Sequence, residues 1–227
     1  MDFKDELNEA QFAAVTAPDG PSLVIAAAGT GKTRTLVYRV AWLIEQGVDP
    51  NRILLLTFTN KAAREMLDRA QTLTGGAVSG LLGGTFHHLA NRLLRRHAYE
   101  IGFGSDYTIL DQDDAKKLVK SCTDELELTD KHFPKPQVLL SLFGLASGSQ
   151  KPLDELAYDW FSDAPVNIED VLKLRNYYVK RKQELNVMDF DDLLLFALKL
   201  FQTSEKVRAQ YQERFQYVLV DEYQDTN

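Results

Sequence analysis

Eight residues from Ala26 to Thr33, with the sequence AAAGTGKT, combine residue types that can hold a phosphate chain. Glycine permits a backbone path on which several N–H groups converge on an anion, and it lets the oxygens come close. Lys32 would reach the β- and γ-phosphates of a nucleotide, and Thr33 would hold magnesium through its hydroxyl. A glycine usually opens this loop pattern, and Ala26 stands there instead. A Gly-rich turn with a chance lysine is the alternative interpretation.

Two adjacent carboxylates, Asp221 and Glu222, follow the apolar run YVLV. In open α/β folds ligands bind at the carboxyl edge of the sheet. A strand at YVLV would place the two carboxylates at that edge. Asp221 would steady the magnesium, directly or through water, and Glu222 would orient and deprotonate an attacking water. An Asp-Glu pair after a strand is also a common loop start. We expect Lys32 with Thr33 and the two carboxylates to meet around one magnesium–triphosphate.

The glycine-rich loop and the carboxylate pair can meet only if the fold brings them together. Strand and helix signals alternate through the first hundred residues. Strands are predicted at Ser22–Ala27, Arg52–Phe58 and Phe215–Val220, with another short strand after the Gly-rich segment GGAVSGLLGG. Helices are predicted from Lys32 to about Gln46, after a cap at Asn60, and from Phe86 to His97. The last strand most economically rejoins the first sheet. The pattern therefore predicts an α/β fold with a parallel sheet covered by helices.

From about Gln112 to Leu185 the pattern changes to helical periodicities separated by Pro and Gly. A further helix is predicted from Asp189 to Phe201. We therefore expect a discontinuous nucleotide-binding lobe formed by residues 1–104 and 189–227, and a mostly helical inserted subdomain at residues 105–188.

The composition is that of an ordinary globular protein of 227 residues, 44% hydrophobic and 26% charged. No apolar run approaches the roughly 20 residues of a membrane-spanning helix, and the start lacks a signal-peptide pattern. We therefore expect a cytoplasmic protein without membrane contact. Cys122 is the single cysteine, which excludes an internal disulfide and a cysteine-based metal cluster.

The net charge is −7, which speaks to solubility more than to any binding site. Two basic strips could nevertheless contact nucleic acid, one with Arg92, Arg95 and Arg96, the other between Lys173 and Lys182. Each strip could equally be a solvated helix face.

Six segments stand in one order along the chain: LNEAQ with the following AV, AAAGTGKTRTLVYRVAWLI, TFTNKAAREM, GTFHHLANRLLRRH, MDFDDLL and VDEYQDTN. In order and approximate spacing they resemble the UvrD/PcrA/Rep-like superfamily 1 DNA helicases. The loop of that family commonly opens with alanine, which accounts for Ala26. The resemblance implies a RecA-like P-loop sheet with a helical insertion, in a lobe that is truncated on its C-terminal side.

The resemblance also implies roles for single residues in binding ATP and Mg²⁺. Gln11 matches a glutamine that reads the adenine edge, Arg34 matches a position near the nucleotide, and Gln224 matches a sensor of the γ-phosphate. The nucleotide would be held by Gln11, Ala26, Ala27, Ala28, Gly29, Thr30, Gly31, Lys32, Thr33 and Arg34. The implied catalytic residues are Lys32, Asp221, Glu222 and Gln224, and the implied metal ligands are Thr33 and Asp221.

For DNA, the resemblance implies single-strand contacts by Phe58, Thr59, Asn60 and Lys61 and by Thr85, Phe86 and His87. The expected partners are single-stranded DNA and junctions of single- and double-stranded DNA. Aromatic rings can stack on bases of any sequence, while hydroxyls and a helix start bind phosphates. Phe58 and Phe86 could equally be core aromatics. The pair His87-His88 lacks the spaced partners of a zinc site.

In this family ATP lies between two RecA-like lobes, and the second lobe supplies a charge-stabilising arginine. We expect that lobe to be missing from this chain. Because an arginine finger is worth about 10³ to 10⁵ in rate, the chain alone is expected to bind ATP, to hydrolyse it poorly and not to unwind DNA. The family leans towards 3′-to-5′ movement. The alternatives are the motor part of a RecB/AddA-like helicase–nuclease, a non-catalytic ATP-binding module that regulates a partner, and a small-molecule kinase.

Overall fold

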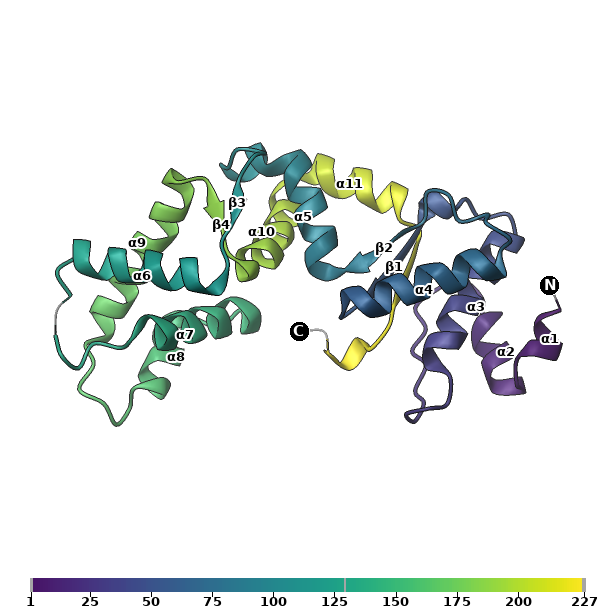
Figure 1. Cartoon of the computed structure of the whole chain (residues 1–227), viewed down its shortest axis with the longest axis horizontal. Helices are drawn as coiled ribbons and strands as arrows, with labels where there is room; N and C mark the ends of the chain where they lie inside the picture. The colour runs from purple at the N-terminus through teal and green to yellow at the C-terminus, as the bar shows by residue number, and fades with distance from the viewer. Residues whose placement is uncertain (1, 129, 226–227) are drawn as a thin grey trace. The chain divides into compact units, whose positions relative to one another are not determined.

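The computed structural model describes residues 2–128 and 130–225 (Figure 1). The chain forms two compact units. The first contains the described residues up to His88 and those from Ala209 onwards, and the second runs from Leu89 to Arg208. Both bounds of the predicted insertion, residues 105 and 188, lie inside the second unit. No helix in the described part of the chain combines the length and apolarity needed to cross a bilayer.

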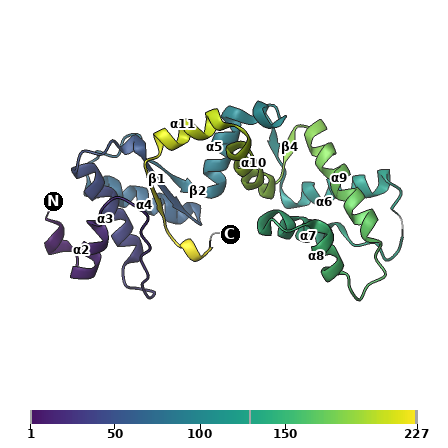
Figure 2. The same ribbon diagram turned by 180° about the vertical axis from the view of Figure 1, so that it is seen from behind.

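A three-stranded parallel sheet forms the centre of the first unit. Its strands are β1 (Ile53–Thr57), β2 (Leu82–Thr85) and β5 (Tyr217–Val220), in the order β2-β1-β5. Strand β5 lies beside β1, although more than 150 residues of chain separate them (Figure 2). The register pairs Leu56 with Val220 and Thr57 with Thr85. All three strands therefore end at one edge of the sheet, and the residues that follow them are brought together there.

Helices α3 (Lys32–Glu45) and α4 (Asn60–Leu73) pack against this sheet. Every residue of β1 is buried, and alternate side chains of a strand point to opposite faces. One hydrophobic core joins the strand to both helices, through Val37, Val40 and Leu43 of α3, Ile53 and Leu55 of β1, and Met66 and Ala70 of α4. The short helices α1 (Phe3–Glu6) and α2 (Glu9–Val15) pack on the outer side of α3, through a smaller core around Phe3 and Val15.

The strand that the sequence predicts at Ser22–Ala27 does not form. This segment makes no strand ladder in the described structure, and Leu23, Val24 and Ile25 are 70%, 52% and 88% exposed. A strand needs a neighbour for its backbone groups and a cover for its apolar side chains. Within the part of the chain that the structure describes, β5 pairs only with β1, so neither need is met for this segment. The prediction from its apolar composition was wrong here.

Other predicted elements form close to the expected bounds. The arginine-bearing helix α5 spans Phe86–His97 and crosses from the first unit into the second. Asn60 is the first residue of α4 rather than its cap, because the hydroxyl of Thr59 accepts the hydrogen bond from the Ala62 N–H at 3.1 Å.

The second unit is mostly helical. Its elements are the end of α5, the short 3-10 helix Ala98–Ile101, β3 (Thr108–Ile109), α6 (Gln112–Glu125), α7 (Pro136–Ser149), α8 (Leu153–Trp160), α9 (Ile168–Glu184), β4 (Val187–Met188), α10 (Phe190–Thr203) and the start of α11 (Glu205–Arg214). Helices α6 to α9 share a core around Leu139, Leu142, Val171 and Leu174. The two-residue strands β3 and β4 pair in parallel, and the sequence did not predict them.

A buried ion cluster joins the end of α9 to the start of α10. The ammonium of Lys182, only 2% exposed, lies 2.7 Å from Asp189 and 2.5 Å from Asp192. The hydroxyl of Tyr178 donates to Asp189 at 3.0 Å. Lys182 is therefore not available to nucleic acid, so the predicted basic strip between Lys173 and Lys182 is shorter than the sequence indicates.

The cluster shifts the pKa values of its two carboxyl groups in opposite directions. Burial raises the pKa of Asp192 to about 6, although Lys182 opposes that shift. Burial also acts on Asp189, but the ammonium of Lys182 and the hydrogen bonds that Asp189 receives outweigh it and hold its pKa below the usual value. Two carboxylates that share one ammonium in a buried site cannot both ionise freely.

Candidate functional site

The glycine-rich loop leads directly into the N-terminus of α3. Gly29 and Gly31 have φ angles of +78° and +87°, in the left-handed region that glycine adopts without steric cost. Gly31 is the N-cap of α3, and no side chain caps the helix, so its first N–H groups have no side-chain acceptor. Ala28 is exposed beside them. Free N–H groups and the positive end of a helix together form a receptor for phosphate.

Three hydrogen bonds from side chains hold the loop in its present shape. The ammonium of Lys32 donates to the carbonyl of Ala26 at 3.2 Å. The hydroxyl of Thr30 donates to the carbonyl of Ala27 at 2.7 Å, and Nε2 of Gln11 donates to the carbonyl of Thr30 at 3.0 Å. The lysine therefore lies over the loop and must exchange the carbonyl for any phosphate that it binds.

Thr33 and Asp221, 188 positions apart in the sequence, are in direct contact. The hydroxyl of Thr33 donates to Oδ2 of Asp221 at 3.1 Å. Asp221 extends the pairing of β5, since its N–H donates to the carbonyl of Leu56 at 2.8 Å, and its side chain is 8% exposed. Thus the first turn of α3 and the end of β5 meet at the carboxyl edge of the sheet.

The two oxygens suit magnesium. Neighbouring ligands of an octahedral ion with bonds of about 2.1 Å lie about 3 Å apart, close to the observed distance between Thr33 Oγ1 and Asp221 Oδ2. No cluster of three or more His, Cys, Asp or Glu side chains within residues 2–128 and 130–225 could form a metal cage. Magnesium commonly takes one or two protein ligands and completes its shell with phosphate and water, so a sparse site is what this ion requires.

Glu222 has an unusual backbone conformation. Its φ is +52°, in the left-handed region that residues with a side chain adopt at a cost of about 1–2 kcal/mol. Its carboxylate accepts a hydrogen bond from Nε2 of Gln224, which belongs to the 3-10 turn Tyr223–Asp225. Strained residues persist where the surrounding structure determines them, and they concentrate at functional sites. The turn directs Glu222 away from the line of the strand and links it to Gln224.

Gln11 is fully engaged within the protein. It occupies the third position of a capping box at the start of α2, where its N–H donates to Asn8 Oδ1 at 2.8 Å and its Oε1 accepts from the Asn8 N–H at 3.2 Å. Its Nε2 meets the loop at Thr30. The spacing of Asn8 and Gln11 is the sequence signature of a capping box and could have been found in advance.

Arg34 belongs to a cluster that the sequence did not indicate. Its Nη2 donates to the backbone carbonyl of Glu6 at 2.7 Å and to its carboxylate at 3.1 Å. The hydroxyl of Tyr38 donates to the same carboxylate at 3.1 Å, and the guanidinium lies 5.1 Å from the Tyr38 ring. The contact ties α3 to α1 across 28 residues of sequence. No local pattern around Glu6 signals it.

The segment after β1 lies at the same sheet edge. Phe58 is 63% exposed. The alternative interpretation of this residue as a core aromatic is therefore wrong. Thr59 caps α4, Asn60 begins it, and Lys61 is exposed on its first turn. An exposed ring beside a helix N-terminus offers both stacking and phosphate contact.

The segment after β2 lies beside it, because Thr57 and Thr85 are paired in the register. Thr85 is 8% exposed, and its hydroxyl accepts from the His88 N–H at 3.1 Å. Phe86 and His87 are half-buried. The structure thus brings together all three groups of predicted site residues, after β1, β2 and β5, at one edge.

Comparison with known proteins gives a family match over nearly the whole chain. Residues 7–227 match the model of the UvrD/REP helicase N-terminal domain. The chain is 37% identical over 226 residues to ATP-dependent DNA helicase PcrA of Staphylococcus aureus (strain Mu50), 38% over 228 residues to DNA helicase II of Haemophilus influenzae, and 39% over 224 residues to PcrA of Bacillus subtilis.

These alignments cover 97–98% of this chain and 30–31% of each relative. The chain therefore spans about three-tenths of the length of the curated relatives it matches. The family match agrees with the order of motifs in the sequence and with the phosphate loop, the paired Thr33 and Asp221, and the parallel sheet. The chain belongs to the UvrD/REP helicase N-terminal domain family.

Proposed function

We propose that this chain is the ATP-binding part of an ATP-dependent DNA helicase or translocase that acts on single-stranded DNA, with 3′-to-5′ movement in the full-length protein. The hydrogen bond between Thr33 and Asp221 carries the proposal, because it unites the phosphate loop with the carboxylate pair. In this proposal residues 1–104 and 189–227 form a RecA-like lobe, and residues 105–188 form its helical insertion. The relatives named as ATP-dependent DNA helicases support the same function.

Each residue of the nucleotide site has a separate task. Thr33 and Asp221 would hold magnesium, which when bound neutralises charge on the phosphate oxygens. Lys32 would leave the Ala26 carbonyl and bind the outer phosphates, and the N–H groups at the start of α3 would surround them. Glu222 would accept the proton of the attacking water.

Gln224 would link the nucleotide site to the DNA site. Its amide donates to the Glu222 carboxylate, so a change in the charge around that carboxylate alters the hydrogen bonding of Gln224. Phe58 and Phe86 would stack on bases, while Thr59, Asn60, Lys61, Thr85 and His87 would contact the backbone or position those that do. DNA would therefore cross the sheet edge that holds the nucleotide, and junctions of single- and double-stranded DNA would be bound by the full-length protein.

The substitution Glu222→Gln in the full-length protein tests the catalytic role. The amide keeps the size of the side chain but cannot accept a proton, so DNA-stimulated ATP turnover should fall by about 10²-fold or more while ATP binding is retained. Steady-state phosphate release and binding of a fluorescent ATP analogue measure the two quantities. Unchanged turnover would contradict the proposal and favour a non-catalytic ATP-binding module.

The substitution Lys32→Ala tests nucleotide binding in the chain itself. Loss of a charged hydrogen-bond donor to phosphate should weaken ATP binding by about tenfold or more. Lys120→Ala, which removes an exposed lysine from α6, is the matched control and should leave the affinity unchanged. Equal affinities for the wild type and Lys32→Ala would exclude the phosphate loop as the nucleotide site.

A further inference from the structure

Three residues beside the phosphate loop form a cluster that has no task in the proposed reaction. Arg34 lies in the first turn of α3, and its guanidinium contacts Glu6 at the end of α1 and Tyr38 one turn further along α3. A Cβ added at Gly31, the N-cap of α3, would lie 3.8 Å from Cβ of Arg34. The cluster is therefore close enough to contact a nucleotide that is held at the start of this helix.

The carboxylate of Glu6 is held in place by the small core of the first unit. It accepts a hydrogen bond from the hydroxyl of Tyr38 at 3.1 Å, and Tyr38 is only 6% exposed. The ring of Phe3 packs edge-on against the Tyr38 ring, with centroids 6.2 Å apart. Leu7, the residue after Glu6, is 7% exposed in the same core. The packing of α1 against α3 therefore fixes where this carboxylate lies.

Glu6 presents two acceptors to one nitrogen of Arg34. Nη2 of Arg34 donates to the Glu6 carbonyl at 2.7 Å and to its Oε2 at 3.1 Å, while the guanidinium lies over the Tyr38 ring, 5.1 Å from its centroid. Nε and Nη1 make no hydrogen bond within residues 2–128 and 130–225, and the Arg34 side chain is 47% exposed. The guanidinium therefore keeps donors and an open side for a ligand.

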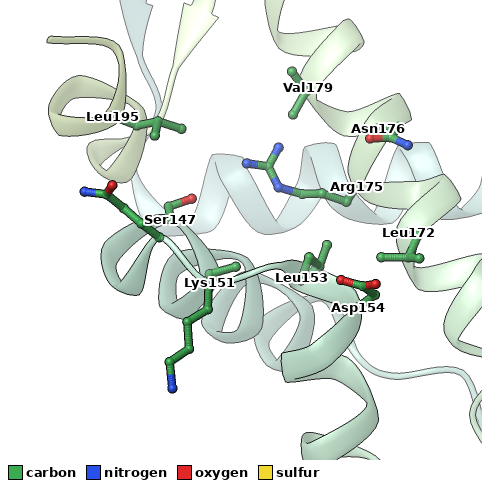
Figure 3. A pocket seen from close by; sticks show the side chains of 11 residues that line it. Ser147, Lys151, Leu153, Asp154, Leu172, Arg175, Asn176, Val179 and Leu195 are labelled. Carbon is green, nitrogen blue, oxygen red and sulfur yellow. The ribbon is translucent and has the colours of Figure 1, made fainter. Parts of the chain in front are cut away.

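Arg175 of α9 shows that an aromatic ring alone can place an arginine. Its guanidinium lies 5.4 Å from the centre of the Phe143 ring, and no carboxylate in the described part of the chain lies within ion-pair distance of it. It borders a hollow of about 600 Å³ in the second unit, which Asp154 also lines (Figure 3). The carboxylate beside Arg34 is therefore not required merely to keep a guanidinium on a ring.

The ion pair between Arg34 and Glu6 also adds little to the stability of the fold. The two side chains are 47% and 53% exposed, and pairs in such contact with water contribute little to folding. The pair does restrict the conformations of a long side chain. An arginine that is ordered before a ligand arrives spares the ligand the cost of ordering it, which corresponds to a factor of about 2 to 12 in affinity.

The carboxylates after β5 determine which end of the triphosphate would lie near Arg34. In the proposed function Asp221 holds magnesium and Glu222 activates the attacking water, so the γ-phosphate would lie on the β5 side of the loop. The nucleoside, at the other end of the triphosphate, would then lie on the side of α3 where α1 and α2 pack. Gln11 and Arg34 border the loop on that side. A planar guanidinium stacks on planar aromatic groups, so Arg34 suits the base of a nucleotide.

We propose that Glu6 is a positioning residue for the nucleoside. Through its carboxylate and its carbonyl it holds Arg34 over Tyr38, and the open side of the guanidinium stacks on the base of the bound nucleotide. Glu6 itself touches neither the base nor the phosphates. This inference rests on the proposed nucleotide site, but it concerns a residue outside the phosphate loop and the carboxylate pair.

Calorimetric titration of the chain with ATP and with inorganic tripolyphosphate, each with Mg²⁺, separates the base from the phosphates. Glu6→Ala should weaken ATP binding by about 2- to 12-fold, because the ligand must then order Arg34. Tripolyphosphate has no base, so its affinity should stay equal or rise, since the loss of a negative charge near an anion site favours the anion. A weaker affinity for ATP alone therefore distinguishes positioning from general electrostatics.

Three further variants show whether Glu6 acts through Arg34. Asp5→Ala removes an exposed carboxylate from the same helix and, as the matched control, should leave ATP affinity equal or slightly higher. Glu6→Gln keeps a neutral acceptor for Arg34 and Tyr38 and should lie between the wild type and Glu6→Ala. It also replaces Glu6→Ala if that variant does not fold by circular dichroism. In an Arg34→Ala background, Glu6→Ala should not weaken ATP binding further, because the two residues act as one unit.

The role of Glu6 is refuted if Glu6→Ala binds ATP as tightly as the wild type, or if it weakens ATP and tripolyphosphate equally. It is also refuted if Glu6→Ala still weakens ATP binding in the Arg34→Ala background. A wild-type chain that binds neither ligand would refute the proposed nucleotide site, and this role with it. A wild-type chain that binds both ligands, combined with no selective effect of Glu6→Ala, would refute the role of Glu6 alone.

Discussion

Gly31 and Glu222, both at the nucleotide site, have backbone conformations that few side chains tolerate. Gly31 has a φ of +87°, and an added Cβ would lie 2.9 Å from Nε2 of Gln11. Glu222 has a φ of +52° despite its side chain. The first conformation opens the helix end to phosphate, and the second turns a carboxylate out of its strand. At the scale of the residue, the site depends as much on backbone geometry as on the side-chain types that the sequence reveals.

Gly31→Ala should weaken ATP binding by at least about tenfold and destabilise the chain by about 1–2 kcal/mol, because alanine is strained at this φ and displaces Gln11 from Thr30. Gly47→Ala is the matched control, since Gly47 has a similar φ of +89° with no atom within 4 Å of the added Cβ. It should cost similar stability and leave ATP binding unchanged. Thermal unfolding and nucleotide titration measure the two effects. Equal nucleotide affinity in both variants would contradict a role for the loop geometry.

At the scale of elements, short-range patterns predicted some features and missed others. The helix Phe86–His97 and the strands around Ile53–Thr57 and Tyr217–Val220 were predicted because their periodicity and apolar content are local properties. The strand at Ser22–Ala27 was not formed, because pairing depends on a neighbour that a sequence pattern does not contain. The short pair β3–β4 was missed for the same reason, since residues about 80 positions apart create it.

Some features of the candidate site could likewise be predicted from the sequence, and others could not. The phosphate loop and the Asp-Glu pair could be found from residue types and spacing, and their meeting could be expected from the rule for parallel sheets. The contacts of Arg34 with Glu6 and Tyr38 could not, because nothing near Glu6 in the sequence marks it as a partner. The burial of Lys182 could not be predicted either. A run of basic residues has the same sequence pattern whether or not carboxylates pack against it in the fold.

The joint between α9 and α10 should respond to pH through Asp192. Its pKa is raised in the folded chain, so between about pH 4 and 6 the folded state binds more protons than the unfolded state and stability falls as pH rises. Asp192→Asn keeps an oxygen that can accept from Lys182 and from the Asp189 N–H but cannot ionise. The variant should therefore gain stability relative to the wild type, on the order of 1 kcal/mol or more, as pH rises from 4 to 6.5.

Urea unfolding of both proteins across this pH range measures the difference, and the comparison cancels the titrating groups that lie outside the cluster of Lys182, Asp189 and Asp192. His97 is one of them, because burial lowers its pKa and makes the folded chain more stable as pH rises. A constant difference between wild type and Asp192→Asn, or one of opposite sign, would show that Asp192 does not carry the raised pKa.

At the scale of the whole molecule, a net charge of −7 means that attraction to DNA comes from a small part of the surface. The proposed DNA edge offers one exposed ammonium, Lys61, together with the start of α4 and the exposed ring of Phe58. Binding of single strands should therefore rely more on stacking than on release of counterions.

The salt dependence of binding separates these two contributions. For oligo-dT, log K against log salt should have a slope of only about −1 to −3, and Lys61→Ala should reduce it by about 0.7. Phe58→Ala should lower affinity by about 1–3 kcal/mol at every salt concentration without changing the slope. Tyr158→Ala, which removes another exposed aromatic side chain, is the control and should have no effect. Fluorescence anisotropy measures the affinity of all four proteins. A steep salt slope for the wild type, together with an unchanged affinity in Phe58→Ala, would refute stacking.

The unpaired segment Ser22–Ala27 has a practical consequence for the isolated chain. It is an uncharged run of six residues, SLVIAA, without proline, and its largest side chains face solvent. Segments of this kind nucleate cross-β aggregation when they are exposed. Concentrated solutions of this chain should therefore form thioflavin-positive aggregates, and a single lysine in place of Val24 should delay them. The residues that lead into the phosphate loop thus set the concentration at which the protein can be handled.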